Sequence, residues 1–146
     1  MDGRLWCSPE LTASVEAAVG PSARLQRFDG PERFDILPLL ICTAGAVSMF
    51  GRDVRRLRPN LLIGGVDGAA ERDWQGTTLK MRDATVRLAD LRGRCVMTTY
   101  HPETIEQDPG VFRAIVRQFG GKLCLNARVG RPGTVNEGDT AELLIS

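Results

Sequence analysis

Two neighbouring segments in which apolar and polar residues alternate constrain the fold of this chain most strongly. The segments are TLKMR at 78–82 and TVRLADL at 85–91, and Asp83-Ala84 between them suits a turn. Successive side chains of a strand point to opposite faces. The pattern therefore predicts two antiparallel strands that share one buried face.

The segment KLCLNARVG at 122–130 alternates in the same way and predicts a third strand. One face would carry Leu123, Leu125, Ala127 and Val129, and the other Cys124, Asn126 and Arg128. Four further short runs are rich in β-prone residues: LLICT at 39–43, NLLIGG at 60–65, CVMTT at 95–99 and AELLI at 141–145. We therefore expect seven or more short strands.

Two helices are marked by their start and stop residues. CSPELTASVEAAVG at 7–20 has a capping serine followed by proline and ends in glycine, and DPGVFRAIVRQFGG at 108–121 has Asp-Pro at its start and Gly-Gly at its end. A shorter helix is expected around Ala46 to Phe50. Many short strands with few helices indicate a mostly β fold, a single-domain β-barrel with flanking helices packed outside it.

Charge and hydropathy argue against several classes of partner. The chain has 146 residues and a formal net charge of +1, so bulk charge favours neither nucleic acid nor a membrane surface. No apolar run reaches the roughly 18 residues of a membrane-spanning helix. We therefore expect no nucleic-acid partner, no membrane, and a cytoplasmic protein with reduced thiols.

The basic residues are unusual in kind, because only Lys80 and Lys122 are lysine and the rest of the 19 are arginine. Coding bias would explain this, and so would recognition of an anion, since guanidinium matches phosphate in a bidentate way. Both explanations can hold together. Pyridoxal phosphate needs a lysine for its Schiff base, and neither lysine stands in a recognisable site, so this cofactor is not expected.

Cys95, in the stretch LRGRCVMTTYHPET at 91–104, is the residue with the widest choice of roles. It follows Arg94, and a nearby cation favours the thiolate, which can act as a nucleophile or a soft metal ligand. Gly93 would allow the irregular backbone that brings the guanidinium to the sulfur. A buried and inert thiol is the alternative.

The other cysteines offer no metal site of their own. Cys7, Cys42 and Cys124 form no C-x-x-C pair, and the single His101 cannot complete a zinc site. Cys42 lies in an apolar run, so we expect it to be buried and inert. Cys124 shares a predicted strand face with Asn126.

Two Asn/Arg pairs are candidates for ligand binding. Pro59 favours an extended backbone at Arg58, which would direct Arg58 and Asn60 to the same side, where they suit a ligand with an anionic group and a heterocycle. The alternative is a solvated basic turn. Asn126 and Arg128 form the second pair, for which the alternative is an exposed sheet face.

Four segments in order resemble the MOSC domain, the C-terminal domain of molybdenum cofactor sulfurases and of the mitochondrial amidoxime-reducing component. They are LRPNLLIGG, DWQGTTLKMRDATVRL, GRCVMTTYHPET and ARVGRPGTVNEGD. The upstream RFDILPLLICT fits the same pattern, so the resemblance covers roughly Asp29 to Ser146. It implies a β-barrel that holds a molybdopterin-type cofactor.

The resemblance also implies site residues. The cysteine of the Arg-Cys pair ligates molybdenum in the amidoxime-reducing branch, and this position is Cys95. The Arg-Pro-Asn motif contributes to cofactor binding, which carries over to Arg58 and Asn60. The residues before the cysteine help to hold the cofactor, which carries over to Gly93 and Arg94. A thiolate suits the metal, arginine suits the cofactor phosphate, and an amide suits the pterin edge.

The chain departs from the family pattern in three places, and one of them is YHPETI at 100–105 where the reductase branch usually has VDPDTG. The reductase branch often has Cys-Ser-Arg-Cys where this chain has RGRC at 92–95. Larger members also carry an N-terminal β-barrel domain that closes the cofactor site. Here residues 1–28, with one helix and a short strand, would be at most a remnant of it, and residues 29–146 would form the MOSC-like barrel.

Three functions are open on this basis. The first is a molybdenum-cofactor-dependent oxidoreductase that reduces N-oxygenated small molecules with a separate electron-donor protein, with Cys95 as catalytic metal ligand. The second is a sulfur or cofactor carrier that uses a persulfide or thiolate on Cys95 without turnover of its own. The third is a non-catalytic binding module.

Overall fold

The computed structural model describes residues 8–26, 30 and 36–145. The chain divides into a small unit, Met1–Asp35, and a larger one, Ile36–Ser146. In the small unit, helix α1 (Pro9–Val19) is capped by Ser8, as predicted. The Ser8 hydroxyl accepts a hydrogen bond from the backbone N–H of Leu11 at 3.2 Å. Residues 20–26 form no strand. Cys7 lies outside the described residues.

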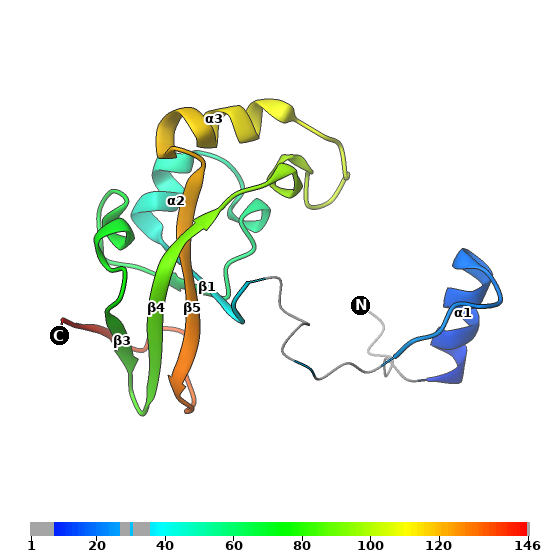
Figure 1. Cartoon of the computed structure of the whole chain (residues 1–146), viewed down its shortest axis with the longest axis horizontal. Coiled ribbons are helices and arrows are strands. Elements are labelled where there is room, and N and C mark those ends of the chain that lie inside the picture. The colour runs from blue at the N-terminus through cyan, green and yellow to red at the C-terminus, as the bar shows by residue number, and fades with distance from the viewer. Residues whose placement is uncertain (1–7, 27–29, 31–35, 146) are drawn as a thin grey trace. The chain divides into compact units, whose positions relative to one another are not determined.

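The larger unit is built on one sheet with the strand order β2-β1-β5-β4-β3-β6. Every neighbouring pair is antiparallel except β1 and β2, which are parallel. Figure 1 shows the long strands β4 and β5 side by side, and they are the two middle strands of the sheet. The strands are β1 (Leu39–Thr43), β2 (Leu61–Ile63), β3 (Thr78–Met81), β4 (Ala84–Gly93), β5 (Lys122–Arg131) and β6 (Ala141–Leu144).

The predicted hairpin is confirmed as β3 and β4, which pair from Thr78 opposite Arg87 to Met81 opposite Ala84. The turn is one residue earlier than predicted. Arg82 takes a left-handed φ of 52°, and Ala84 already belongs to β4 with its side chain buried.

The sheet curls into a half-barrel with β2 and β6 at its two edges. The mostly β fold with helices packed outside is therefore confirmed, in an open form. The described residues contain six strands rather than the seven or more expected. One apolar cluster fills one face of the sheet: Ile41, Leu79, Met81, Val86, Leu88, Leu125 and Ala127.

A second apolar cluster joins the helices to one end of the sheet, where Figure 1 shows α2 (Ala44–Phe50) and α3 (Pro109–Phe119). α3 has an apolar stripe that faces this cluster, because residues four apart lie on one helix face and Val111, Ile115 and Phe119 are all buried. The cluster consists of Cys42, Ala46, Phe50, Leu57, Val111, Ile115, Phe119, Leu123 and Cys124.

The segment 95–99, predicted as a strand, is instead the short 3-10 helix η4 (Val96–Thr99). β4 ends at Gly93 opposite Lys122, the first residue of β5, so β5 offers no partner for a continued strand. The hydroxyl of Thr98 donates to the carbonyl of Cys95 at 2.9 Å, a local bond that competes with strand pairing.

Cys42 and Cys124 form a disulfide, which differs from the expectation of reduced thiols. Both are fully buried, as expected for Cys42. Cys124 has a φ of 67°, and this left-handed residue interrupts the predicted alternation of β5. Leu123 consequently packs in the same cluster as Cys124, apart from Leu125 and Ala127.

Candidate functional site

Cys95 lies where β4 leads into η4. Its backbone is extended, it occupies the N-cap position of η4, and its side chain is exposed. Among the described residues it is the one free cysteine. Val96 and Met97, which follow it, are 52% and 57% exposed. Cys95 is therefore not a buried filler residue, and its sulfur is accessible to a ligand or a partner.

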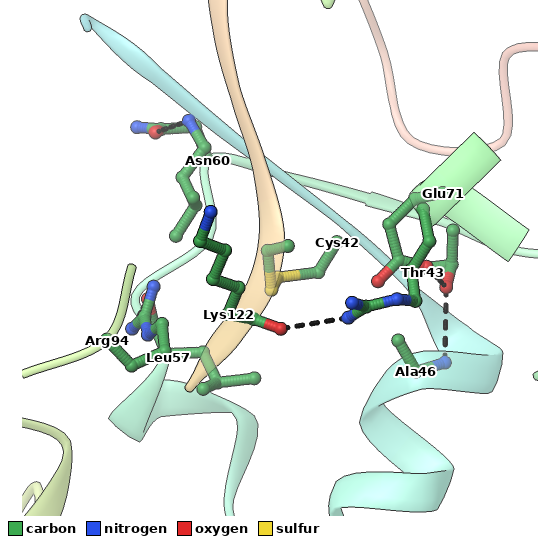
Figure 2. The surroundings of a disulfide bond; sticks show 11 residues. Cys42, Thr43, Ala46, Leu57, Asn60, Glu71, Arg94 and Lys122 are labelled. Carbon is green, nitrogen blue, oxygen red and sulfur yellow. Dashed lines mark hydrogen bonds between the residues drawn. A yellow bond between two sulfur atoms is a disulfide. The ribbon is translucent and has the colours of Figure 1, made fainter. Parts of the chain in front are cut away.

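Arg94 is anchored at two points. Its backbone N–H donates to the carbonyl of Gly121 at 2.9 Å, and its Nη2 donates to the carbonyl of Leu57 at 2.8 Å, in the arrangement that Figure 2 shows. Burial, with a smaller contribution from nearby Arg92, lowers the pKa of Arg94 to about 10. The guanidinium thus stays cationic at neutral pH, and its buried Nε has no hydrogen-bond partner among the described residues.

Arg58 does not have the extended backbone that Pro59 was predicted to impose. Its φ is 56°, and its N–H donates to the carbonyl of Arg55 at 3.2 Å. It therefore closes the turn that begins with the 3-10 helix η2 (Val54–Arg56). A left-handed residue after a helical turn reverses the chain, here towards β2. The side chain of Arg58 is exposed.

Asn60 pairs with the backbone of β1 just before β2 begins. Its N–H donates to the carbonyl of Leu40 at 2.9 Å, and its Oδ1 accepts from the N–H of Leu40 at 2.8 Å. The side-chain oxygen is therefore already engaged by backbone, and the residue fixes the entry of the chain into β2. Figure 2 shows this amide beside the start of β2.

Asn126 is 1% exposed, so it is not part of an open sheet face. Its Oδ1 accepts from Nη1 of Arg92 at 3.3 Å, and its Nδ2 donates to Asp90 at 3.2 Å. Arg128 is exposed and lies opposite Arg87. Both residues of the second pair thus lie on β5, but Asn126 holds side chains of β4 instead of facing solvent.

These contacts form one row across the sheet. Asn60 binds Leu40, Leu40 lies opposite Asn126 in the β1–β5 pair, and Asn126 binds Arg92. Arg92 was missed by the sequence reasoning, although it lies in the same RGRC stretch as Arg94.

Gly93, between Arg92 and Arg94, is exposed, and nothing lies within 4 Å of where its Cβ would be. This leaves the backbone next to Cys95 open to a ligand.

The structure has a large cavity, and the candidate site around Cys95 lies outside it. A cavity of about 980 Å³ opens between the edge strands β2 and β6, lined by Leu79 and Met81 of the sheet's apolar cluster and by residues 135–141. Of the predicted site residues, Asn60 alone lines it. Cys95 and Arg94 therefore form a surface site at the end of β4, whereas Arg128 lies opposite Arg87, six residues before that end.

None of the described helices is long and apolar enough to cross a membrane. Likewise, the described residues contain no cluster of three or more His, Cys, Asp or Glu side chains arranged to hold a metal ion.

Comparison with known proteins supports the fold. The family model for the MOSC domain matches residues 47–142, a range that includes Arg58, Cys95 and Arg128. The crystal structure of APC1665, the YUAD protein from Bacillus subtilis, is similar with a TM-score of 0.53 and 19% sequence identity. The similarity covers 82% of this chain and 75% of that chain. The search of curated proteins finds no significant match.

Proposed function

Because the chain belongs to the MOSC domain family, we propose that it binds a molybdenum cofactor and that Cys95 provides the thiolate ligand of the metal. The observation that carries this proposal is the exposed, unpaired sulfur of Cys95 directly after the anchored cation Arg94. A thiolate is a soft ligand of the kind such a metal takes, and a guanidinium suits a phosphate.

The residues present fit the metal and the phosphate of the cofactor better than they fit its pterin. The buried Nε–H of Arg94 has no hydrogen-bond partner among the described residues, and an anion would provide one. Arg58, which directly follows Leu57 in the sequence, is exposed. The side-chain oxygens of Asn60 and Asn126 are engaged by protein groups. We therefore assign these two asparagines to positioning the site.

The proposed activity is the reduction of N-oxygenated small molecules in the cytoplasm, with electrons from a separate donor protein. When bound, the cofactor supplies the redox chemistry, and the protein binds and orients it. Arg94 would hold the anionic group of the cofactor, and Arg58, which follows the Arg94 anchor Leu57, would be a further cation. Cys95 would hold the metal at the surface, within reach of the substrate and the donor.

A carrier role is the second candidate, and the exposure of the site favours it. Cys95 lies on the surface next to exposed Val96 and Met97, outside the large cavity. A persulfide or a cofactor held there would be accessible to a receiving protein. In that case Cys95 would pass on sulfur or cofactor without turnover.

Metal analysis of protein from a host that makes the cofactor tests these proposals. We expect stoichiometric molybdenum in the wild-type protein and in the control variant Cys7→Ser. The control makes the same substitution at a cysteine outside residues 47–142, the range of the family match. We expect a strong loss in Cys95→Ser. Metal-free protein with a persulfide on Cys95, detected by mass spectrometry, would support the carrier. Molybdenum retained in full by Cys95→Ser would reject Cys95 as the ligand.

A further inference from the structure

The Cys42–Cys124 disulfide lies at an interruption of the sheet. The β1–β5 ladder runs as far as Ile41 opposite Leu125, and the next residue on each strand is one of the two cysteines. Their Cα atoms are 4.6 Å apart. On the other side of β5, the β4–β5 ladder shifts register in the same region. The covalent bond therefore joins two strands where backbone pairing on both sides of β5 is irregular.

The backbone of Cys124 gives a second, independent sign that this position is held under constraint. Its φ of 67° lies in the left-handed region, which is unfavourable for a residue with a Cβ. Such conformations persist where the surrounding structure enforces them, and they concentrate at ligand sites and switches. Here the residue in this conformation is itself one end of the disulfide.

The disulfide supports both anchors of Arg94. Leu57, whose carbonyl accepts from the guanidinium, packs in the same buried cluster as Cys42 and Cys124. Gly121, whose carbonyl accepts from the Arg94 N–H, directly precedes β5 and lies three residues before Cys124. Figure 2 shows the disulfide together with Leu57 and Arg94. A shift of the cysteines would thus reach the residue next to Cys95.

We propose that the Cys42–Cys124 pair is a redox switch of the candidate site, with the disulfide holding Arg94 in its binding position and reduction releasing it. A dithiol reductant would cleave the S–S bond, transfer two electrons and two protons to give the thiols of Cys42 and Cys124, and become a disulfide itself. Two thiol sulfurs need more separation than two bonded sulfurs, and a close-packed core transmits that displacement. Leu57 and β5 would move, and with them both anchors of Arg94.

The switch rests on the proposed function in one respect, since it regulates the site assigned to the cofactor. In a reducing cytoplasm, disulfides are usually catalytic or redox-sensing instead of structural. Both sulfurs are fully buried, so a reductant reaches them only when the structure opens. Coupling is reciprocal. An anion bound to Arg94 should therefore make the disulfide harder to reduce.

The test compares the oxidised chain with the same chain reduced by dithiothreitol and desalted without oxygen, its thiol state checked by intact mass. Hydrogen exchange of the Arg94 N–H reports the anchor to Gly121. The N–H of Leu88, which donates to the carbonyl of Thr77 at 3.0 Å on the far side of β4, is the control. Inorganic phosphate, titrated by calorimetry, probes the anion site.

On reduction we expect faster exchange at Arg94, unchanged exchange at Leu88, and phosphate affinity lower by about fivefold or more. Cys42→Ser/Cys124→Ser should behave as the reduced chain. Cys95→Ser should keep the full response at Arg94, because it leaves the disulfide in place.

Three results would overturn the switch: no disulfide in the oxidised chain, equal Arg94 exchange in both states, or loss of protection at Leu88 as well, which would make the bond a staple of the whole domain. The outcome is separable from that of the proposed function. Protein that takes up no molybdenum, yet shows the redox response at Arg94, would reject the cofactor proposal and retain the switch. Molybdenum uptake without a redox response at Arg94 would reject the switch and retain the cofactor proposal.

Discussion

The guanidinium of Arg94 donates to the carbonyl oxygen of Leu57 at 2.8 Å. This hydrogen bond connects two sequence motifs that are 37 residues apart, because Leu57 precedes the Arg-Pro-Asn motif and Arg94 precedes Cys95. The two motifs are therefore in contact, and the half-buried cation Arg94 lies between them.

Replacing Arg94 should weaken cofactor retention. Hydrogen bonds to a charged group contribute about 1.5–3 kcal/mol each, so Arg94→Ala should lower the affinity for the cofactor by about tenfold or more. Molybdenum content after exhaustive dialysis measures the effect. Arg24→Ala, which removes an exposed arginine paired with Glu16 in the small unit, is the control and should retain the metal. Equal retention by both variants would contradict the role of Arg94.

Asn126 should matter for stability far more than its strand neighbour Arg128. Asn126→Ala removes two hydrogen bonds from a buried position and leaves Asp90 and Arg92 without their amide partner. We expect a loss of about 2–3 kcal/mol in the free energy of unfolding, measured by urea denaturation. Arg128→Ala, an exposed change, should stay within about 0.5 kcal/mol. Similar losses in both variants would show that Asn126 does not hold β4.

Thr43 should be needed to keep Glu71 in the interior. The Thr43 hydroxyl donates to Oε2 of Glu71 at 2.6 Å. As the N-cap of α2, the same hydroxyl accepts from the N–H of Ala46 at 3.1 Å. Glu71 is fully buried, and its Oε1 has no partner among the described residues. Thr43→Val leaves the carboxyl without this donor and removes the cap, which should cost about 3 kcal/mol or more.

Thr43→Ser is the matched control, because it keeps the hydroxyl and loses only a methyl group, worth about 1 kcal/mol. Thermal or urea unfolding of the two variants separates the contributions. If valine were tolerated as well as serine, the hydroxyl would not be what stabilises Glu71.

Asp53 should stay ionised to unusually low pH. Hydrogen bonds from the Arg55 side chain and backbone lower the pKa of Asp53 from 3.8 to about 2. Since the folded pKa is the lower one, the associated stability is fully present above pH 3.8 and is lost as the pH falls through about 2. An NMR titration of the Asp53 carboxyl should give this low midpoint.

Arg55→Ala should raise the midpoint of Asp53 back towards its ordinary value. Glu103→Gln provides the comparison, because Glu103 binds Arg55 at 2.9 Å but is not a cause of the Asp53 shift. It should leave the Asp53 titration nearly unchanged. A normal midpoint in the wild-type protein would contradict the Asp53–Arg55 arrangement.

Features with a local signal were predicted well. α1 and α3 begin and end at their capping residues, because a cap is satisfied within the first turn. The β3–β4 hairpin follows from alternation and a two-residue turn. Cys95 emerged as the central residue from its position after Arg94 and from the family resemblance, and its exposure agrees with that role. Its role as a ligand stays a prediction.

The sequence by itself determined most of the helices and strands, because caps, turns and alternation act over a few residues. The exception is the segment 95–99, where the 3-10 helix η4 forms instead of a strand. Only the tertiary structure decided the strand order and the pairing of Cys42 with Cys124, which are 82 residues apart. It also decided that the side-chain oxygens of Asn60 and Asn126 accept hydrogen bonds from protein groups. A side chain's partner depends on which distant strand lies beside it, and that is set by packing of the whole sheet and not by neighbours in the chain.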